Sequence, residues 1–260
     1  MPIEPAASTG NLLLDALSGS DRALIERDLE PVTVARGDTI LTADSGASPV
    51  IFPCDQTVVA LVVTTHDGRM AETASVGHDG AVGGIIGQGR LPNAVSGLVQ
   101  VGGRVLRLDA DGLREAERRS ATFRDLFARY ADCFLAQLLL IGACNAVHPI
   151  EQRCLRWLLT LQDRTGGDTL PVTHELMAAM LGVQRTYLTR ILRMLQEQGL
   201  LRAERGRITI VDRRAVSAAA CACHARVRRH CEAVLGAVYG PDGPRRAAPD
   251  ADAGPVSRTA

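Results

Sequence analysis

The sequence predicts an α+β protein with an N-terminal part of short antiparallel strands, one long apolar helix, and a C-terminal helical part that ends in a β-hairpin. Three observations predict this arrangement. Short β-rich runs punctuated by glycine, aspartate and proline fill residues 31–108, which is typical of an antiparallel barrel or sandwich. Residues 121–147 keep helical apolar periodicity throughout. Residues 173–212 combine two short helices, a tight turn between them, and two short strands.

Charge divides the chain into two parts of opposite sign. Residues 1–150 contain 12 arginines against 18 acidic residues, a net of −6, and residues 151–240 contain 14 against 8, a net of +6. Only the second part therefore suits a polyanionic partner. No apolar run approaches the length of a membrane span and no signal-peptide pattern begins the chain, so we expect a cytoplasmic protein that does not enter a membrane. Seven cysteines, an odd number, do not indicate a secreted disulfide framework.

The N-terminal domain is expected to span residues 11–120. Short helices are predicted around LLLDAL and DRALIERDL, and strands at PVTVA, DTILT, VIFP, TVVALVVTT, VSGLVQV and RVLRL. The turns between them contain RGD, HDGR, GHDG and GQGRLPN. After Leu108, the segment DADGLREAERRS has helical periodicity, with an aspartate available as its cap.

Residues 121–147 are predicted to form one helix with two apolar sides. A heptad seam contains Tyr130, Cys133, Gln137, Leu140, Cys144 and Val147, and a second stripe contains Phe127, Phe134, Leu138 and Ile141. A helix that is apolar on two sides needs two partners. We expect one side to pack on the chain's own β domain and the seam to pack on a second copy, which makes this a dimerisation helix in a homodimer. Burial of both sides within a monomer is the alternative.

Residues 148–235 are expected to form a winged helix-turn-helix domain. A helix over IEQRCLRWLLTLQD ends before a Gly-Gly pair, and Thr173 and Gly182 are well placed to begin and end the helix THELMAAML. The next helix closes at Gly199, and LLRAERGRITIVD is predicted to be a hairpin that turns at Arg205-Gly206. Helix, tight turn, helix and hairpin together are the winged form of the helix-turn-helix.

The second helix of this motif has a cationic face. Arg185, Thr186, Thr189, Arg190 and Arg193 fall within roughly 140° of arc, opposite Leu188, Ile191, Leu192 and Leu195. Because this helix enters the major groove of double-stranded DNA, the residues expected to read bases are Arg185, Thr186, Thr189 and Arg190. Those expected to contact phosphates are Thr173, Arg193, Arg202, Arg205 and Arg207. The alternative is the solvated side of an ordinary amphipathic helix.

The stretch VTHELMAAMLGVQRTYLTRILRMLQEQGLL followed by RGRITIVDR resembles the CRP/FNR family of bacterial transcription regulators. VIFP, HDGR, VGHDGAVG, the long helix and HPIEQRCLRWLL extend the resemblance over about residues 11–235, to a subgroup in which the sensor domain is often degenerate. The resemblance implies a cyclic-nucleotide-binding-like double-stranded β-roll, a dimerisation helix, and a winged helix-turn-helix on a palindromic operator, with RNA polymerase as a candidate partner. The family's recognition helix opens with Arg-Glu; here Arg185 and Arg190 keep the arginines, and Thr186 replaces the glutamate.

The sensor departs from nucleotide-binding members of the family. Those members have a Gly-Glu for the ribose and an Arg-Ser for the cyclic phosphate. In this chain Gly84 stands at the glutamate, and Ala94 and Val95 stand at the arginine and serine. Without these charge-assisted partners, an anionic phosphate would be held poorly. The resemblance therefore predicts that cyclic AMP and cyclic GMP do not bind.

No other cofactor is predicted for the sensor. Iron–sulfur members of the family carry an N-terminal cysteine cluster, whereas this chain has only Cys54 before residue 133. Heme-sensing members use a histidine, but the histidines of HDGR and GHDG are expected to lie unliganded in surface turns. In the CACH segment, Cys221 and Cys223, with Cys231 nearby, are candidates for a metal or redox site. Packing of small apolar residues in a helix is the alternative for these cysteines.

The chain contains no P-loop, GxSxG or HExxH motif and no convincing carboxylate pair, so we do not expect an enzyme. Two functions of different class remain. One is a DNA-binding transcription regulator; the other is a small-molecule or redox-sensing module whose winged helix mediates protein contacts. Residues 236–260 are predicted to be a disordered tail, because the last twenty of them contain four prolines and show no apolar periodicity.

Overall fold

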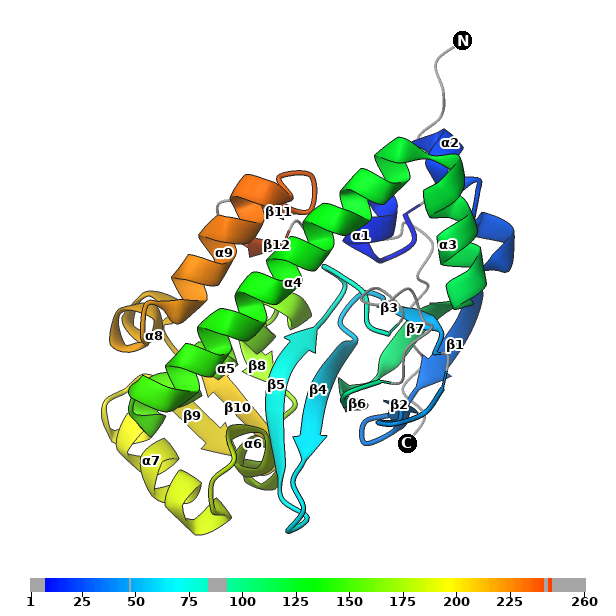
Figure 1. Ribbon diagram of the computed structural model, residues 1–260. Coiled ribbons are helices and arrows are strands. Elements are labelled where there is room, and N and C mark those ends of the chain that lie inside the picture. The colour runs from blue at the N-terminus through cyan, green and yellow to red at the C-terminus, as the bar shows by residue number, and fades with distance from the viewer. Residues whose placement is uncertain (1–7, 47, 84–92, 241–242, 245–260) are drawn as a thin grey trace, which may run out of the picture.

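The computed structural model describes residues 8–46, 48–83, 93–240 and 243–244 (Figure 1). The chain begins with α1 (Leu12–Asp15), α2 (Gly19–Arg22) and a 3-10 turn (Glu26–Asp28). Asn11, which is buried, accepts hydrogen bonds from the first turn of α1 and donates to the carbonyl oxygens of Pro53 and Gly80. These bonds hold the N-terminal helices against the β domain, as the position of α1 in Figure 1 also shows.

Seven strands form the β domain in two antiparallel sheets, β1-β7-β3 and β2-β6-β4-β5. Their bounds are β1 (Glu30–Val34), β2 (Thr39–Leu41), β3 (Val50–Pro53), β4 (Val58–Thr64), β5 (Met70–Val76), β6 (Ser96–Val101) and β7 (Gly103–Leu108). Buried aliphatic side chains from both sheets form one cluster that includes Val34, Ile51, Val59, Leu61, Val99 and Val105. The alternation of apolar residues along the strands thus produces the predicted antiparallel β domain.

Strand β5 was not predicted from its sequence, MAETASV. Alanine, glutamate and serine have low strand propensity, so the segment carries no period-2 apolar signal. Pairing with β4 over residues 59–64 makes it a strand. Its buried Glu72 accepts hydrogen bonds from the Trp157 indole N–H (2.8 Å) and the Gln100 amide (2.6 Å), contacts that tertiary structure alone supplies.

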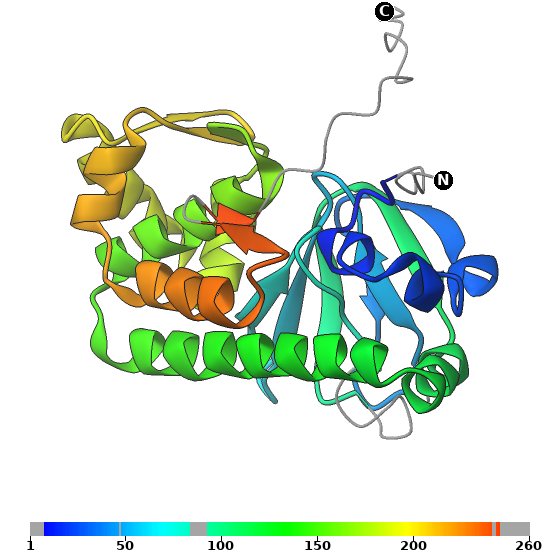
Figure 2. The ribbon, with the colours of Figure 1, turned by 90° about the horizontal axis from the view of Figure 1, so that it is seen from above.

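Helices α3 (Ala110–Arg119) and α4 (Ala121–Val147) connect the β domain to the rest of the chain. Asp109 occupies the predicted cap position of α3, although its side chain makes no capping hydrogen bond. Ser120 caps α4 by accepting from the backbone N–H of Phe123 (3.1 Å). Helix α4 has the predicted bounds and runs along both the β domain and the C-terminal domain (Figure 2).

The seam on α4 that we assigned to a second copy packs mainly inside the chain. Tyr130, Cys133, Gln137 and Cys144 are buried; the Tyr130 hydroxyl donates to the carbonyl of Ala81 (2.7 Å). Of the seam, Val147 at the end of the helix is 72% exposed; the other large exposed apolar side chains of α4 are Leu135 and Leu139, which lie outside the seam and are 50% and 65% exposed. This corrects the predicted interface: a heptad pattern locates apolar stripes but does not say which partner each stripe meets.

Helix α4 also corrects the expectation that no apolar run approaches the length of a membrane span. It is long and apolar enough to cross a membrane by length and composition alone. Its apolar 18-residue segment has a mean hydropathy of 1.5, and 28% of that segment is buried inside the protein. One such helix is weak evidence for a span, because the core helix of a soluble protein can pass the same test. Here α4 packs on β5, α3 and α9.

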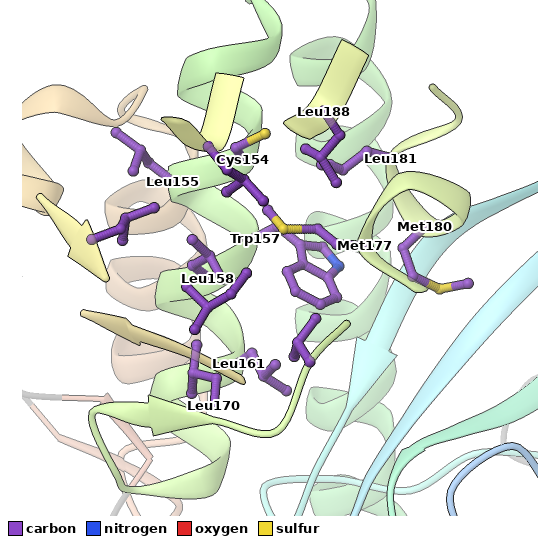
Figure 3. Close-up of a cluster of buried hydrophobic side chains, with 14 of the residues drawn as sticks. Cys154, Leu155, Trp157, Leu158, Leu161, Leu170, Met177, Met180, Leu181 and Leu188 are labelled. Atoms are coloured by element: carbon purple, nitrogen blue, oxygen red, sulfur yellow. The ribbon is translucent and has the colours of Figure 1, made fainter. Parts of the chain in front are cut away.

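The C-terminal domain has the predicted winged helix-turn-helix elements. These are α5 (Ile150–Thr165), β8 (Thr169–Leu170), α6 (His174–Leu181), α7 (Arg185–Glu197), β9 (Leu201–Glu204) and β10 (Arg207–Ile210). Figure 3 shows Trp157 of α5 beside Met177 in the buried cluster between these helices. The two-residue strand β8 pairs with β10 and was not predicted, because two residues carry no periodicity.

The β domain and the winged domain share an apolar core. Val58, Ala60 and Val62 of β4 belong to the same buried cluster as Trp157 and Leu158 of α5. Helix α6 also contacts β5. The two domains are therefore packed against each other rather than joined only through α4.

The chain continues past the wing into α8 (Arg213–Ala219), α9 (Cys223–Val234), β11 (Tyr239–Gly240) and β12 (Gly243–Pro244). Helix α9 lies along α4 (Figures 1 and 2). Val238 and Tyr239 are buried in a cluster with α1 and α4 side chains, so the predicted disordered tail is wrong for residues 236–240 and 243–244. The apolar Val238 and Tyr239 are too few to make a periodic signal. Residues 241–242 and 245–260 lie outside the described part of the chain.

Candidate DNA-binding face

Helix α6 begins and ends where the sequence predicts. The Thr173 hydroxyl accepts from the backbone N–H of Leu176 (3.1 Å), which caps the helix. Gly182 ends it in the left-handed region at φ +67°, where a side chain would be strained. The chain reverses there, and α7 starts three residues later and packs against α6.

Helix α7 presents the predicted cationic face to solvent. Its buried side chains are Leu188, Ile191, Leu192 and Leu195. The exposed ones are Arg185, Thr186, Thr189, Arg190 and Arg193, together with Tyr187 and Glu197. The division into two faces follows the 3.6-residue period of the sequence.

The arginines of α7 differ in their partners. Arg193 pairs with Glu197 (3.6 Å). Arg185 and Arg190 form no ion pair with any acidic residue in the described ranges. The Arg190 guanidinium lies 5.7 Å from the ring centroid of Tyr187, which orients it without neutralising it. Arg185 and Arg190 can therefore offer their N–H groups to an anion or to a base.

Two residues beside this face were missed by the sequence analysis. Tyr187 is 39% exposed, and His174 of α6 lies with Nδ1 3.3 Å from the Thr189 hydroxyl. That hydroxyl donates to the carbonyl of Arg185 (2.9 Å). Burial, and then the charge of Arg185, lower the pKa of His174. A histidine at the start of α6, opposite a threonine of α7, was the available signal.

The wing places its three arginines in solvent. Arg202, Arg205 and Arg207 are exposed, and Gly206 supplies the positive φ of +77° that the hairpin turn requires. Arg207 pairs with Glu204 (2.9 Å). The roles predicted for the three arginines, and for Thr173 and Arg193, in phosphate binding remain predictions.

In the β domain, Gly84 lies outside the described residues. Val95 packs against the apolar cluster between the sheets, and Ala94 is exposed. His78 is buried, not in a surface turn as expected. Burial lowers the pKa of His78. The segment around it packs closely on α4: a Cβ at Gly80 would lie 2.4 Å from the Tyr130 hydroxyl oxygen, so the GHDG sequence reflects tight packing.

A buried polar network joins the sensor, α4, α5 and the C-terminal segment. Arg164 of α5 pairs with Asp79 (3.2 Å) and donates to Ser75 (2.5 Å) and to Gln137 of α4 (3.1 Å). The Tyr239 hydroxyl donates to Asp79. Burial alone would raise the pKa of Asp79, but Arg164, His78 and the hydrogen bonds lower it to about 2. The sequence carried no signal for this network, because its members are far apart in the chain.

The candidate cysteines fall into two separate places. Cys221 lies between α8 and α9, Cys223 begins α9, and both meet Cys144 and His148 at the end of α4. Cys231 lies in a different cluster, near Cys133. Cys231 therefore does not belong with the other two candidates, and sequence analysis missed Cys144 and His148 as their neighbours. A cysteine and a histidine close together at the end of the predicted helix, Cys144 and His148, were the available signal.

Comparisons with known proteins match this architecture. Residues 152–219 match the Crp-like helix-turn-helix domain family. The fold is similar to FixK2 from Bradyrhizobium japonicum, with a TM-score of 0.65 at 15% identity over 74% of this chain and 98% of that one. It is also similar to a CRP/FNR family transcriptional regulator from Eubacterium rectale, with a TM-score of 0.62 at 19% identity over 79% of this chain and 96% of that one.

A third similar structure is the c-di-GMP-responsive global regulator CLP from Xanthomonas campestris, with a TM-score of 0.62 at 14% identity over 75% of this chain and 100% of that one. No curated protein matches the chain. Residues 152–219 therefore form a Crp-like helix-turn-helix domain, and the chain shares its fold with these solved structures.

Proposed function

We propose that this protein regulates transcription by binding double-stranded DNA through α7, as a homodimer on an inverted-repeat operator. The observation that carries the proposal is the exposure of Arg185 and Arg190 on the second helix of the motif, without an acidic partner in the described chain. Arginine forks fit guanine O6 and N7, and this helix is the element that enters the major groove.

The homodimer is supported by the exposed stripe on α4, centred on Leu135 and Leu139. These residues are one turn apart, and Ala128, Gly142 and Ala146 are exposed on the same side of the helix. Two copies of α4 could pack along this stripe about a two-fold axis. Light scattering should then give about twice the chain mass of 27.7 kDa. Leu139→Arg should give a monomer, whereas Met70→Arg on the β4–β5 hairpin should leave the dimer intact; a dimeric Leu139→Arg protein would refute this interface.

A two-fold dimer presents two recognition helices, so the half-sites should be about 10–10.5 bp apart, centre to centre, or a multiple of that spacing. Each half-site should contain at least one strongly preferred guanine, read by Arg185 or Arg190. Thr186 has no carboxylate to accept from cytosine N4. The base opposite Thr186 should therefore be read loosely, or through contact with a thymine methyl group.

The effector is proposed not to be a cyclic nucleotide. The positions that correspond to the family's phosphate contacts are Ala94 and Val95, and Val95 packs against the sensor core. Charge-assisted hydrogen bonds contribute roughly 1.5–3 kcal/mol each, so their absence would weaken binding by orders of magnitude. Calorimetry with cyclic AMP and cyclic GMP tests this, and micromolar affinity for either would contradict it.

Selection of bound duplexes from a random pool tests the DNA-binding proposal. We expect symmetric sites, and Arg185→Ala and Arg190→Ala should each cost about 1–3 kcal/mol of binding and relax the preference at one base. Arg119→Ala, an exposed arginine on α3, is the matched control and should bind like the parent. Asymmetric sites, or an Arg185→Ala protein with unchanged affinity and preference, would refute the assignment.

A further inference from the structure

Three thiols and one imidazole converge where α4 ends and where α8 meets α9. Cys144 is on the last turn of α4, His148 follows that helix, and Cys221 and Cys223 lie at the start of α9. The four potential ligand atoms all lie within 4.8 Å of one another. The Sγ atoms of Cys144 and Cys221 are 3.5 Å apart, and Cys223 Sγ is 3.7 Å from His148 Nδ1.

These separations match a tetrahedral zinc site. With Zn–S bonds of about 2.3 Å and a Zn–N bond of about 2.0–2.1 Å, the edges of the tetrahedron are about 3.8 Å between sulfurs and about 3.6 Å between sulfur and nitrogen. The distances of 3.5 Å and 3.7 Å lie within a few tenths of an ångström of these values. Small side-chain adjustments would bring the remaining pairs to ligand distance.

The surroundings suit a thiolate site. All three cysteines are buried and His148 is half-buried. Zinc with three thiolates and a neutral imidazole carries a net charge of −1, which needs compensation inside a protein. Arg156 of α5 is buried, its Nε has no hydrogen-bond partner among the described residues, and it lines the same pocket as Cys223. A buried guanidinium with an unused N–H donor thus lies beside the thiols and can compensate this charge.

The frame around the cluster is already held in place by other contacts. Asp163 of α5 accepts from His224 Nε2 at the start of α9 (2.7 Å) and pairs with Arg213 of α8. These bonds position the α8–α9 junction independently of the cysteines. The donor set is therefore preorganised, which reduces the entropic cost of binding an ion.

We propose that Cys144, His148, Cys221 and Cys223 bind one zinc-like divalent ion, and that this ion couples α4 to the winged domain. Sulfur and imidazole ligands select zinc or a similar soft ion over magnesium or calcium. His148-Pro149 is the link from α4 into α5, and residues 220–222 link α8 to α9. An ion shared by the two links fixes the orientation of the winged domain relative to α4. The regulatory part of this inference rests on the proposed function in DNA binding.

The competing chemistry is a disulfide between Cys144 and Cys221. Its formation would remove one proton and one electron from each thiol and pass them to an external two-electron oxidant. The histidine and the third cysteine would then have no role, and a metal would not protect the thiols from oxidation. The experiment distinguishes the two cases.

The test uses the full chain, reduced and stripped with a chelator, and Co²⁺ as a spectroscopic probe for zinc. We expect one Co²⁺ per chain, thiolate-to-cobalt charge-transfer and tetrahedral d–d absorption bands, and full displacement by Zn²⁺. Cys223→Ser should weaken Co²⁺ binding at least tenfold. Cys231→Ser, which removes a buried cysteine outside the cluster, is the matched control and should bind like the parent.

His148→Gln is a second variant in case Cys223→Ser fails to fold. It changes a half-buried side chain at the edge of the cluster and should disturb the fold less. It should fold, bind Co²⁺ at least tenfold more weakly, and show an altered d–d spectrum. The proposal is overturned if the parent chain shows no tetrahedral thiolate spectrum, if Cys231→Ser loses binding equally, or if Zn²⁺ leaves disulfide formation at Cys144 and Cys221 unchanged.

Coupling is measured as the affinity for a selected operator with and without Zn²⁺. We expect a change of about fivefold or more, the lower end of typical allosteric coupling, which is absent in His148→Gln. Equal affinities would overturn the coupling. Because Co²⁺ binding is measured without DNA, a chain that binds metal but no DNA would contradict the proposed function alone, and a chain that binds DNA but no metal would contradict the metal site alone.

Discussion

Helices α5 and α7 belong to the same winged domain and both carry arginines, but the environments of these arginines are opposite. Arg156 and Arg164 of α5 are each 5% exposed, and Arg164 is surrounded by hydrogen-bond partners from the sensor and from α4. Arg185 and Arg190 of α7 are in solvent. Whether an arginine contributes to folding stability or to ligand binding therefore depends on the residues that the fold places around it.

The difference assigns separate roles to the two helices. The buried guanidinium of Arg164 is satisfied by a carboxylate and further acceptors, so Arg164 fixes the winged domain against the β domain. An exposed guanidinium adds little to folding and stays available to a ligand. Substitutions in α5 should therefore change stability, whereas substitutions in α7 should change DNA binding.

The largest expected effect is that of Arg164→Met. It leaves Asp79 buried beside Tyr239 without its cationic partner, and removal of one member of a buried pair costs about 3–5 kcal/mol. We expect that loss in the free energy of unfolding, measured by urea denaturation. Arg193→Ala on α7, whose ion pair with Glu197 is exposed, should change it by less than about 0.5 kcal/mol.

The double variant Asp79→Asn with Arg164→Met sharpens this test. If the uncompensated charge causes the loss, removing both charges should restore part of the stability. Equal destabilisation by Arg164→Met and Arg193→Ala would mean that the buried network does not hold the domains together.

An intermediate effect is expected from acid. The pKa of Asp79 is lowered to about 2 from its ordinary value of 3.8, so its ionised form stabilises the fold above about pH 4. That contribution should be lost as the pH falls from about 4 toward 2. The midpoint temperature of thermal unfolding should fall more steeply over this pH range for the parent than for Asp79→Asn. Parallel curves for the two proteins would contradict the assignment.

Sequence reasoning located the elements whose signals are local. Thr173, Gly182 and Gly199 mark helix ends through backbone conformation and capping, and the 3.6-residue period separates the two faces of α7. These features depend on residues close together in the chain. The boundaries of α4 and the hairpin turn at Gly206 were predicted for the same reason.

The parts that were missed depend on contacts between distant residues. Strand β5 exists because β4 pairs with it, and the internal packing of Tyr130 and Cys133 depends on the loop at Gly80 and on α9. Cys144 and Cys221 are 77 positions apart and meet only after folding. Local propensity carries no information about contacts between distant residues. The packing of the α4 seam and the cysteine cluster could therefore be seen only in the structure.

The smallest expected effect concerns the wing. Arg205 is exposed at the hairpin turn and forms no ion pair within the described residues, whereas Arg207 is paired with Glu204 (2.9 Å). If both contact phosphates, Arg205→Ala and Arg207→Ala should weaken binding to all duplexes alike. Each should reduce the slope of log affinity against log salt by about 1. The loss should be smaller for Arg207→Ala, because Arg207 gives up its pairing with Glu204 on binding.

Affinities measured across a range of salt concentrations check this prediction about the wing. Arg185→Ala, whose main effect should be on base preference, is the comparison. A change of base preference in Arg205→Ala would show that the wing reads sequence, and an unchanged salt slope would show that it does not reach the DNA.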